Sequence, residues 1–168
     1  MIRLLRSTAG AAYLWFLAGT QLLMAASAPL ALHPENPHYF LFRGQPTLLI
    51  TSGEHYGAVL NLDFDYLKYL DTLNHAGLNL TRTFTGAYVE PGGAFNIARN
   101  TLAPAPNRFL APWARSRTPG YANGGNKFDL TKWDAAYFKR LKDFVAEAAR
   151  RGIVVRSEER RVGKECRL

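Results

Sequence analysis

Cysteine is almost absent from this sequence of 168 residues, because Cys166 is the only one. A disulfide framework and a site with several thiolate metal ligands are therefore excluded. The four histidines are scattered, and the sequence contains neither a glycine-rich phosphate loop nor a G-x-S-x-G nucleophile motif. We therefore expect no metal site and no cofactor.

A concentrated basic face is also lacking, although the net charge is +8. Arg3 and Arg6 carry two of these charges, and residues 156–168 carry a net two more. The lysines and arginines between these ends are scattered, whereas nucleic-acid binding needs basic residues gathered on one face. The sequence therefore predicts no nucleic-acid partner.

The N-terminal residues have the pattern of a secretory signal. Two arginines precede an apolar run over residues 9–26, and Ala26-Ser27-Ala28 has the small-x-small form that a signal peptidase prefers. An uncleaved membrane anchor is the alternative, but Thr20 and Gln21 interrupt the run. We predict that residues 1–28 are a signal peptide and that the mature protein is secreted or periplasmic, with no stable membrane association.

The C-terminal residues 156–168 break the pattern that precedes them. The charged run RSEERRVGKECR begins directly after the apolar residues 153–155, with no turn residue between them. This run resembles the conceptual translation of a short-read sequencing adapter, although Leu168 departs from that pattern. A solvated charged terminus is the alternative. We predict that residues 156–168 are not native and that Val155 is the last genuine residue.

Residues 39–51 have the pattern of a β-hairpin. Two apolar runs surround Arg43-Gly44-Gln45, which has the composition of a turn. The second run is continuous enough for a strand that is covered on both faces. The sequence therefore predicts that residues 48–51 form a first buried strand.

A helix and a second strand follow. Asp63 is the expected N-cap of a helix from Phe64 to about His75, and Leu67, Leu70 and Leu73 make its apolar face. Gly77 is expected to end this helix by taking a left-handed backbone. Residues 78–84 are rich in β-forming residues, so the sequence predicts a strand–helix–strand unit with parallel strands.

A long stretch, residues 86–127, is dense in glycine, proline, asparagine and aromatic residues and is expected to be irregular. Loops of this length at the carboxyl end of a strand are usually functional. A second helix is predicted from a capping box at residues 131–134 to Arg151, with Trp133 and Tyr137 in its core face. Residues 153–155 are expected to open a third parallel strand.

Two segments resemble the clan-A-type, cellulase-like (β/α)8-barrel glycoside hydrolases. Residues 66–82 contain the motif G-x-N-x-x-R at Gly77, Asn79 and Arg82, and residues 128–155 are similar to the next helix and strand of that family. With the hairpin, the resemblance covers residues 38–155. It implies an α/β fold, an incomplete (β/α)8 TIM barrel, made of the hairpin, two strands joined by a helix, the long loop, a second helix and the start of a third strand.

The resemblance also implies a function. The family's acid/base and nucleophile glutamates are expected after the fourth and seventh strands, so this chain holds no catalytic residue of the pair. Residues 29–155 make 127 positions, whereas a barrel needs about 250. We expect the N-terminal part of a secreted glycoside hydrolase, inactive by itself. The alternative is a non-catalytic carbohydrate-binding or cell-surface barrel.

Candidate substrate-binding residues follow the first predicted strand. Glu54, His55 and Tyr56 place a carboxylate, an imidazole and a phenol at the end of the strand that faces substrate in a barrel. The polar groups can bond sugar hydroxyls, and the ring can pack against the apolar side of a pyranose. A polar turn that serves only the local backbone is the alternative.

Arg82 lies inside an apolar strand, where a guanidinium needs a partner. A carboxylate at the centre of the barrel is the expected partner, and the resemblance implies that Arg82 supports the nucleophile. A structural ion pair is the alternative.

The long stretch contributes Tyr88 as a further candidate substrate-binding residue. Tyr88, Phe95, Trp113 and Tyr121 either line a sugar cleft or form the small core of the loop itself. Glu90 has the chemistry of a catalytic group, but no partner stands at a recognisable spacing from it.

Overall fold

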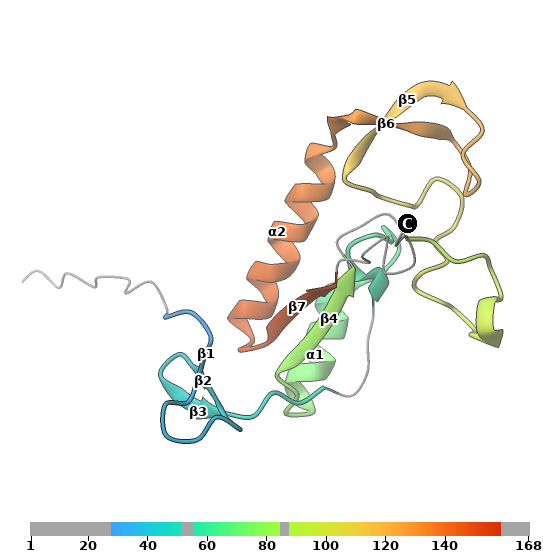
Figure 1. The fold of residues 1–168 in the computed structure, drawn as a ribbon. Helices are drawn as coiled ribbons and strands as arrows, with labels where there is room; N and C mark the ends of the chain where they lie inside the picture. The colour runs from blue at the N-terminus through green and yellow to red at the C-terminus, as the bar shows by residue number, and fades with distance from the viewer. Residues whose placement is uncertain (1–27, 52–55, 85–87, 159–168) are drawn as a thin grey trace, which may run out of the picture. The chain divides into compact units, whose positions relative to one another are not determined.

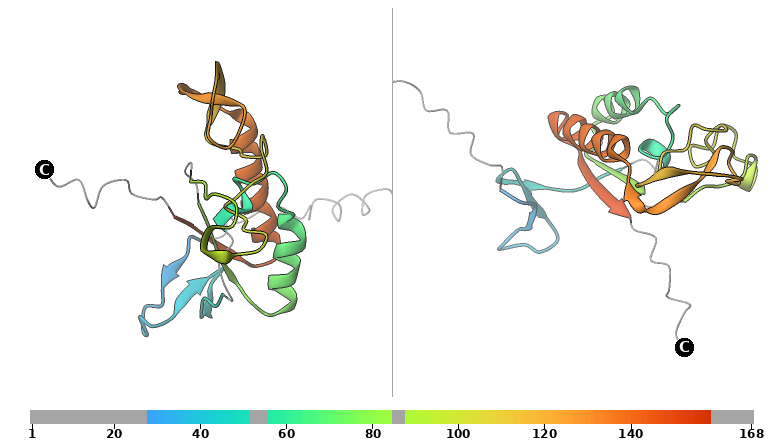
Figure 2. Two further views of the ribbon diagram at one scale, coloured as in Figure 1. Left: turned by 90° about the vertical axis from the view of Figure 1, so that its right-hand side faces the viewer. Right: turned by 90° about the horizontal axis from the view of Figure 1, so that it is seen from above.

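The computed structural model describes residues 28–51, 56–84 and 88–158. Met1–Thr47 and Leu48–Leu168 form two separate compact units, whose elements are drawn in Figures 1 and 2. The predicted signal peptide lies outside the described residues except for Ala28, and so do residues 159–168 of the predicted non-native tail.

The first unit contains a small antiparallel sheet. Its strands are β1 (Ala31–Leu32), β2 (Phe40–Phe42) and β3 (Gln45–Thr47), in that order across the sheet. The turn Arg43-Gly44 joins β2 to β3 with φ angles of 52° and 77°, so that Phe42 pairs with Gln45. Two successive positive φ angles match the twist of a tight hairpin, and glycine adopts them without strain. The predicted hairpin is confirmed.

Residues 48–51 do not form the predicted buried strand. Leu48 and Ile50 are 51% and 52% exposed, and the segment belongs to no sheet. It still lies beside the next strand, because the amides of Asn79 and Leu80 both donate to the carbonyl of Ile50 at 3.1 Å. Backbone bonds to one neighbour fix the path of the segment but cover neither of its faces, so its apolar side chains remain accessible to solvent.

Helix α1 (Tyr66–His75) begins two residues later than predicted. Its N-cap is Asp65, whose carboxylate accepts a hydrogen bond from the amide of Lys68 at 3.1 Å. The expected cap, Asp63, instead forms an ion pair with Arg108 at 2.6 Å. Both aspartates have the capping chemistry, so the sequence pattern could not choose between them.

The apolar face and the end of α1 follow the sequence more closely. Leu70 and Leu73 are buried as predicted, whereas Leu67 is 44% exposed and lies off the core face. Gly77 ends the helix with a φ of 69°, and the amide of Leu78 donates to the carbonyl of Leu73 at 2.9 Å. This is the bond of a Schellman motif, which requires a left-handed residue at the glycine position.

Two parallel strands form the central sheet of the second unit. β4 (Leu80–Phe84) pairs with β7 (Val154–Glu158), with Leu80 opposite Val154 and Phe84 opposite Glu158. The predicted parallel arrangement of these two strands is confirmed. Because β7 continues to Glu158, the first three residues of the predicted non-native tail lie in this sheet.

Helix α2 (Ala135–Arg150) is capped by Asp134, whose carboxylate accepts from the amide of Ala136 at 2.8 Å. The predicted capping box is wrong, because Thr131 lies in a strand. Trp133 is also in that strand and is 69% exposed, so its predicted place in the helix core is wrong. Tyr137 is buried as predicted.

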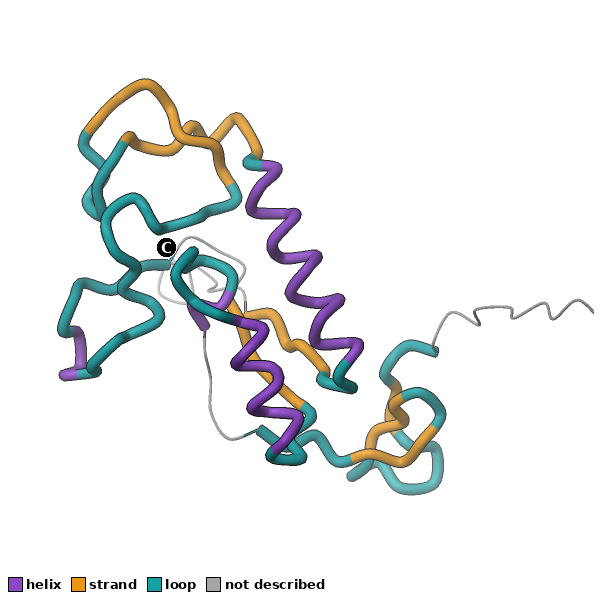
Figure 3. The backbone as a smooth tube through the Cα atoms, turned by 180° about the vertical axis from the view of Figure 1, so that it is seen from behind, coloured by secondary structure: helices purple, strands orange, loops and turns teal. Residues whose placement is uncertain are grey.

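The stretch predicted to be irregular contains regular structure. β5 (Trp113–Pro119) and β6 (Asn126–Trp133) form an antiparallel hairpin with register shifts along its length. The same stretch contains the short 3-10 helix η2 (Ala94–Asn96). A second short 3-10 helix, η1 (Tyr56–Ala58), lies before α1 and outside this stretch. Figure 3 shows the hairpin beyond the N-terminal end of α2.

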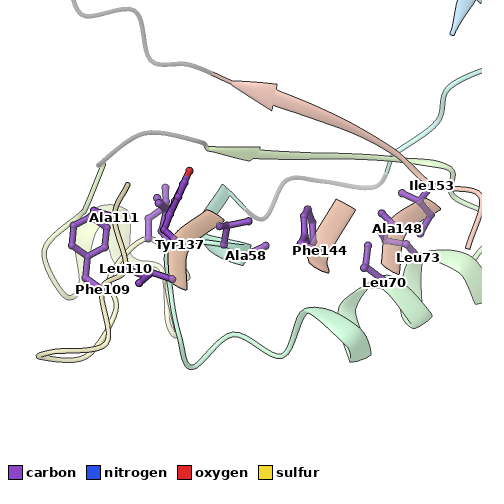
Figure 4. Close-up of a cluster of buried hydrophobic side chains, with 13 residues drawn as sticks. Ala58, Leu70, Leu73, Phe109, Leu110, Ala111, Tyr137, Phe144, Ala148 and Ile153 are labelled. Atoms are coloured by element: carbon purple, nitrogen blue, oxygen red, sulfur yellow. The ribbon is translucent and has the colours of Figure 1, made fainter. Parts of the chain in front are cut away.

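The core of the second unit lies against the β4–β7 sheet, with α1 and α2 on the same side of the two strands (Figure 4). Its apolar side chains are drawn from both helices, from the segment that follows η1 and from the segment before β5. They are Ala58, Val59, Leu60, Leu70, Leu73, Leu102, Phe109, Leu110, Ala111, Tyr137, Phe144, Ala148 and Ile153. Among the described residues, no helix has the length and apolar character that crossing a membrane would require.

Candidate functional site

The candidate site lies at the carboxyl end of β4, next to η1 (Figure 1). Three of the five predicted substrate-binding residues meet there, namely Tyr56, Arg82 and Tyr88. The other two, Glu54 and His55, lie outside the described residues. The site can therefore be built from η1, from β4 and from the segment that begins at Tyr88.

Three aromatic rings, those of Tyr56, Phe84 and Tyr88, form what we call the aromatic cluster, in which each tyrosine ring contacts Phe84. The Tyr56 and Phe84 rings are stacked, with centroids 4.3 Å apart and an angle of 15° between their planes. Tyr88 meets Phe84 edge to face, with centroids 5.5 Å apart and an angle of 77°. All three residues are partly exposed, and they also pack against the buried core.

Phe84 belongs to this site although it was not among the predicted residues. It is the last residue of β4 and its ring joins the two tyrosines. Its position in the sequence could have predicted this, since an aromatic residue at the carboxyl end of a parallel strand can line the binding site there.

Arg82 adds a positive charge to one side of the aromatic cluster. Its guanidinium carbon lies 5.4 Å from the centroid of the Tyr56 ring, which is the range of a cation–π contact. The neighbours of Arg82 in β4, Thr81 and Thr83, are fully buried, so Arg82 lies on the opposite face of the strand from the helices. The predicted carboxylate partner of Arg82 stays a prediction.

Hydrogen bonds from two elements hold the backbone near Tyr56. The hydroxyl of Thr83 donates to the carbonyl of Tyr56 at 3.3 Å, which ties η1 to β4. Gly57 packs so closely on Thr101 that a Cβ at this glycine would lie 2.1 Å from the Thr101 carbonyl oxygen. Only glycine fits this contact, and it joins η1 to the segment that follows the aromatic cluster.

Arg140 of α2 holds the segment that follows η1. Its guanidinium donates to four backbone carbonyls at 2.9–3.1 Å, those of Ala58, Val59, Asn61 and Phe64. It also lies 4.9 Å from the centroid of the Tyr66 ring. Burial lowers the pKa of the guanidinium, and Tyr66 acts in the opposite direction. Sequence reasoning missed this residue, because its partners are backbone groups about 80 positions away.

Glu90 now has the partners that its sequence context did not reveal. The hydroxyl of Tyr88 donates to one carboxylate oxygen at 3.0 Å, and the side-chain amide of Asn100 donates to the other at 2.5 Å. The amide of Glu90 donates to the carbonyl of Leu102 at 2.7 Å. Glu90 therefore connects the aromatic cluster, through Tyr88, to Asn100 and Leu102 further along the same connection.

The other aromatic residues of the long stretch lie in different surroundings. Tyr121 stacks on Phe109 and meets Phe128 edge to face, at centroid distances of 5.9 and 5.0 Å. This is the small local core that was the alternative to a cleft. Trp113 stacks on Trp133 at 6.3 Å. Phe95 is 78% exposed.

The charges and rings at the carboxyl end of β4 define what this site can do. Its described residues include aromatic rings, the Arg82 guanidinium and the Glu90 carboxylate, which suit a ligand with an apolar side and several hydrogen-bonding groups. Within the described ranges, no group of three or more His, Cys, Asp or Glu side chains is placed to hold a metal ion.

Comparison with known proteins gives likeness to solved structures but no match in sequence. No family model and no curated protein sequence matches the chain. Among solved structures, it is similar to the crystal structure of a "putative glycoside hydrolase" from Bacteroides vulgatus, with a TM-score of 0.53 and 17% sequence identity. The match covers 79% of this chain and 24% of that protein, so the chain spans about a quarter of its length. The chain therefore has a partial α/β fold that is similar to part of that protein.

Proposed function

We propose that the chain is the N-terminal part of a secreted glycoside hydrolase and that the aromatic cluster, with Arg82, forms part of its sugar-binding site. In this proposal β4 and β7 are neighbouring strands of a (β/α)8 barrel. Residues 1–28 are the secretion signal, and hydrolysis of the O-glycosyl bond belongs to the longer protein.

The position of the aromatic cluster is the observation that carries the proposal. Ligands of α/β proteins bind at the carboxyl ends of the parallel strands, which is where Phe84 and Tyr88 follow Arg82 along the chain. Aromatic faces pack against the apolar side of a pyranose, while charged groups bond its hydroxyls. The likeness to a protein described as a glycoside hydrolase supports the same substrate class.

A non-catalytic carbohydrate-binding barrel is the second candidate. The observation that favours it is that both oxygens of the Glu90 carboxylate already accept hydrogen bonds, one from Tyr88 and one from Asn100. Glycoside hydrolysis by the usual mechanism needs two carboxyl groups about 5–10 Å apart, one on each side of the scissile bond. The second candidate therefore binds sugar without cleaving it.

The decisive experiment is to read the gene beyond the codon for Val155, to produce the full-length protein and to assay it on cellulose, xylan and mannan. Release of reducing sugar, lost in Arg82→Ala and kept in the exposed control Lys68→Ala, supports the hydrolase. Sugar binding without release supports the binding barrel. Neither binding nor release, in a folded protein, contradicts both proposals.

A further inference from the structure

Glu90 is a charged side chain whose orientation is fixed from both sides. Tyr88 donates to one carboxylate oxygen and Asn100 to the other, while the Glu90 amide is bonded to Leu102. The two side-chain bonds leave the carboxylate little freedom to rotate, and the amide bond fixes the backbone that carries it. Such a group is preorganised, so a ligand that bonds it loses little conformational entropy of the side chain.

The carboxylate also keeps acceptor capacity for a ligand. A carboxylate has about four lone-pair positions, and the two neutral donors occupy one position on each oxygen. Among the described residues, no lysine or arginine forms an ion pair with Glu90. The residue is partly exposed, so its remaining lone pairs can be reached. Each oxygen of the Glu90 carboxylate can therefore accept one further hydrogen bond.

The Tyr88 ring beside Glu90 determines which hydrogen-bond donors of a ligand can reach the carboxylate. Glu90 is bonded to the hydroxyl of Tyr88, and the Tyr88 ring packs against Phe84 in the aromatic cluster. A sugar ring that lies against these aromatic faces carries its hydroxyl groups at its rim. Adjacent hydroxyls of such a ring match a carboxylate that has one free position on each oxygen.

We propose that Glu90 is a ligand-binding residue of this site, with its carboxylate accepting hydrogen bonds from hydroxyl groups of a neutral sugar residue that lies against Tyr88. This inference rests on the proposed function, because it needs a sugar at the aromatic cluster. It adds a preference within that function. A sugar acid whose carboxylate approaches Glu90 meets a like charge, so this position selects neutral sugars.

The test is isothermal titration calorimetry of the full-length protein with cellohexaose, xylohexaose and mannohexaose as neutral probes and hexagalacturonate as the anionic probe. Glu90→Gln keeps the size of the side chain and removes its charge and one acceptor oxygen. We expect Glu90→Gln to weaken the binding of any neutral probe that the parent protein binds by about tenfold, as the loss of one charge-assisted hydrogen bond does. It should also narrow the preference for neutral over anionic probes.

Two further variants separate direct binding from general damage. Tyr88→Phe removes only one of the two donors that orient Glu90, so we expect a smaller loss of about threefold. Glu35→Gln makes the same chemical change at an exposed glutamate of the first unit and should leave the affinity unchanged. Thermal melting of each variant checks that the compared proteins are folded. Glu90→Asp shortens the side chain by one methylene group and keeps its charge, so it gives a second measurement of the same contact.

The outcomes separate the inference from the function on which it rests. The inference is wrong if three results occur together. A neutral probe binds, Tyr56→Ala abolishes that binding, and the affinities of Glu90→Gln and Glu90→Asp both stay within about twofold of the parent protein. In that case a sugar binds at the aromatic cluster without Glu90. A parent protein that prefers hexagalacturonate also overturns the inference. If the folded parent protein binds none of the four probes, the proposed function fails and the inference fails with it.

Discussion

Replacing Asn79 with leucine should loosen the segment that precedes η1 from the central sheet. The Asn79 side-chain amide donates to the carbonyl of Leu48 at 2.8 Å, and its oxygen accepts from the amide of Ile50 at 2.7 Å. The side chain therefore acts like a short piece of strand between residues 48–50 and β4. Leucine has a similar size and can make neither bond.

The magnitude follows from these two bonds. Each contributes about 1 kcal/mol at most, and less where water can replace the lost partner, so Asn79→Leu should lower the free energy of unfolding by about 1–2 kcal/mol. A domain of this size loses roughly 3 °C of Tm per kcal/mol, which predicts a fall of about 3–6 °C. Asn79→Asp should cost at least as much, because it turns the donor toward the Leu48 carbonyl into an acceptor.

Thermal melting followed by circular dichroism measures the global effect, and hydrogen exchange of the Ile50 amide measures the local one. The amide of Ile50 should lose its protection in Asn79→Leu, because its acceptor is gone. Asn74→Leu, at an exposed position of α1, is the matched control and should not lower Tm. The reasoning is refuted if Asn79→Leu melts with the parent protein and the exchange of Ile50 is unchanged.

Three other perturbations test separate parts of the second unit. Gly57→Ala should prevent soluble expression or lower Tm steeply, because the new Cβ would lie 2.1 Å from the carbonyl oxygen of Thr101; an unchanged Tm contradicts that contact. Arg140→Met should cost about 3–5 kcal/mol in urea unfolding, because four backbone carbonyls lose their donor, and a loss below about 1 kcal/mol would count against this role. Thr131→Val should raise the pKa of Asp129 from about 2 toward its ordinary value, because the Thr131 hydroxyl gives the largest lowering; NMR titration measures this. Since the folded pKa is the lower one, the stabilisation by Asp129 is present above about pH 4 and is lost as the pH falls toward about 2.

Local signals in the sequence predicted much of the second unit. Gly77 ends α1 as expected, because a left-handed position after a helix favours glycine whatever the tertiary context. Leu70 and Leu73 are buried because a helix that lies on a sheet buries one stripe. The parallel pairing of β4 with β7 follows from a helix placed between two strands.

Features set by distant partners were not predictable in the same way. The β5–β6 hairpin was missed because its strands have irregular register and lie among glycine and proline residues. Trp133 fits a helical spacing in the sequence but lies in β6, where it stacks on Trp113. The exposure of Leu48 and Ile50 could not be foreseen either, because their apolar run is typical of a strand with neighbours on both faces.

The candidate site was predictable in its position but not in its composition. The rule that sites lie at the carboxyl ends of strands led to Tyr56, Arg82 and Tyr88, and the structure brings these three together. Phe84 and the partners of Glu90 required coordinates, because ring stacking and a hydrogen bond across ten residues of loop leave no periodic pattern. The role of these residues in binding sugar stays a prediction.

The most direct measurement is the structure of the full-length protein with a neutral oligosaccharide bound. The account predicts a sugar ring in van der Waals contact with at least one ring of the aromatic cluster, at the carboxyl end of β4 and within reach of Arg82 or Glu90. An oligosaccharide bound at another face of the protein, with the aromatic cluster free of ligand, would contradict the account.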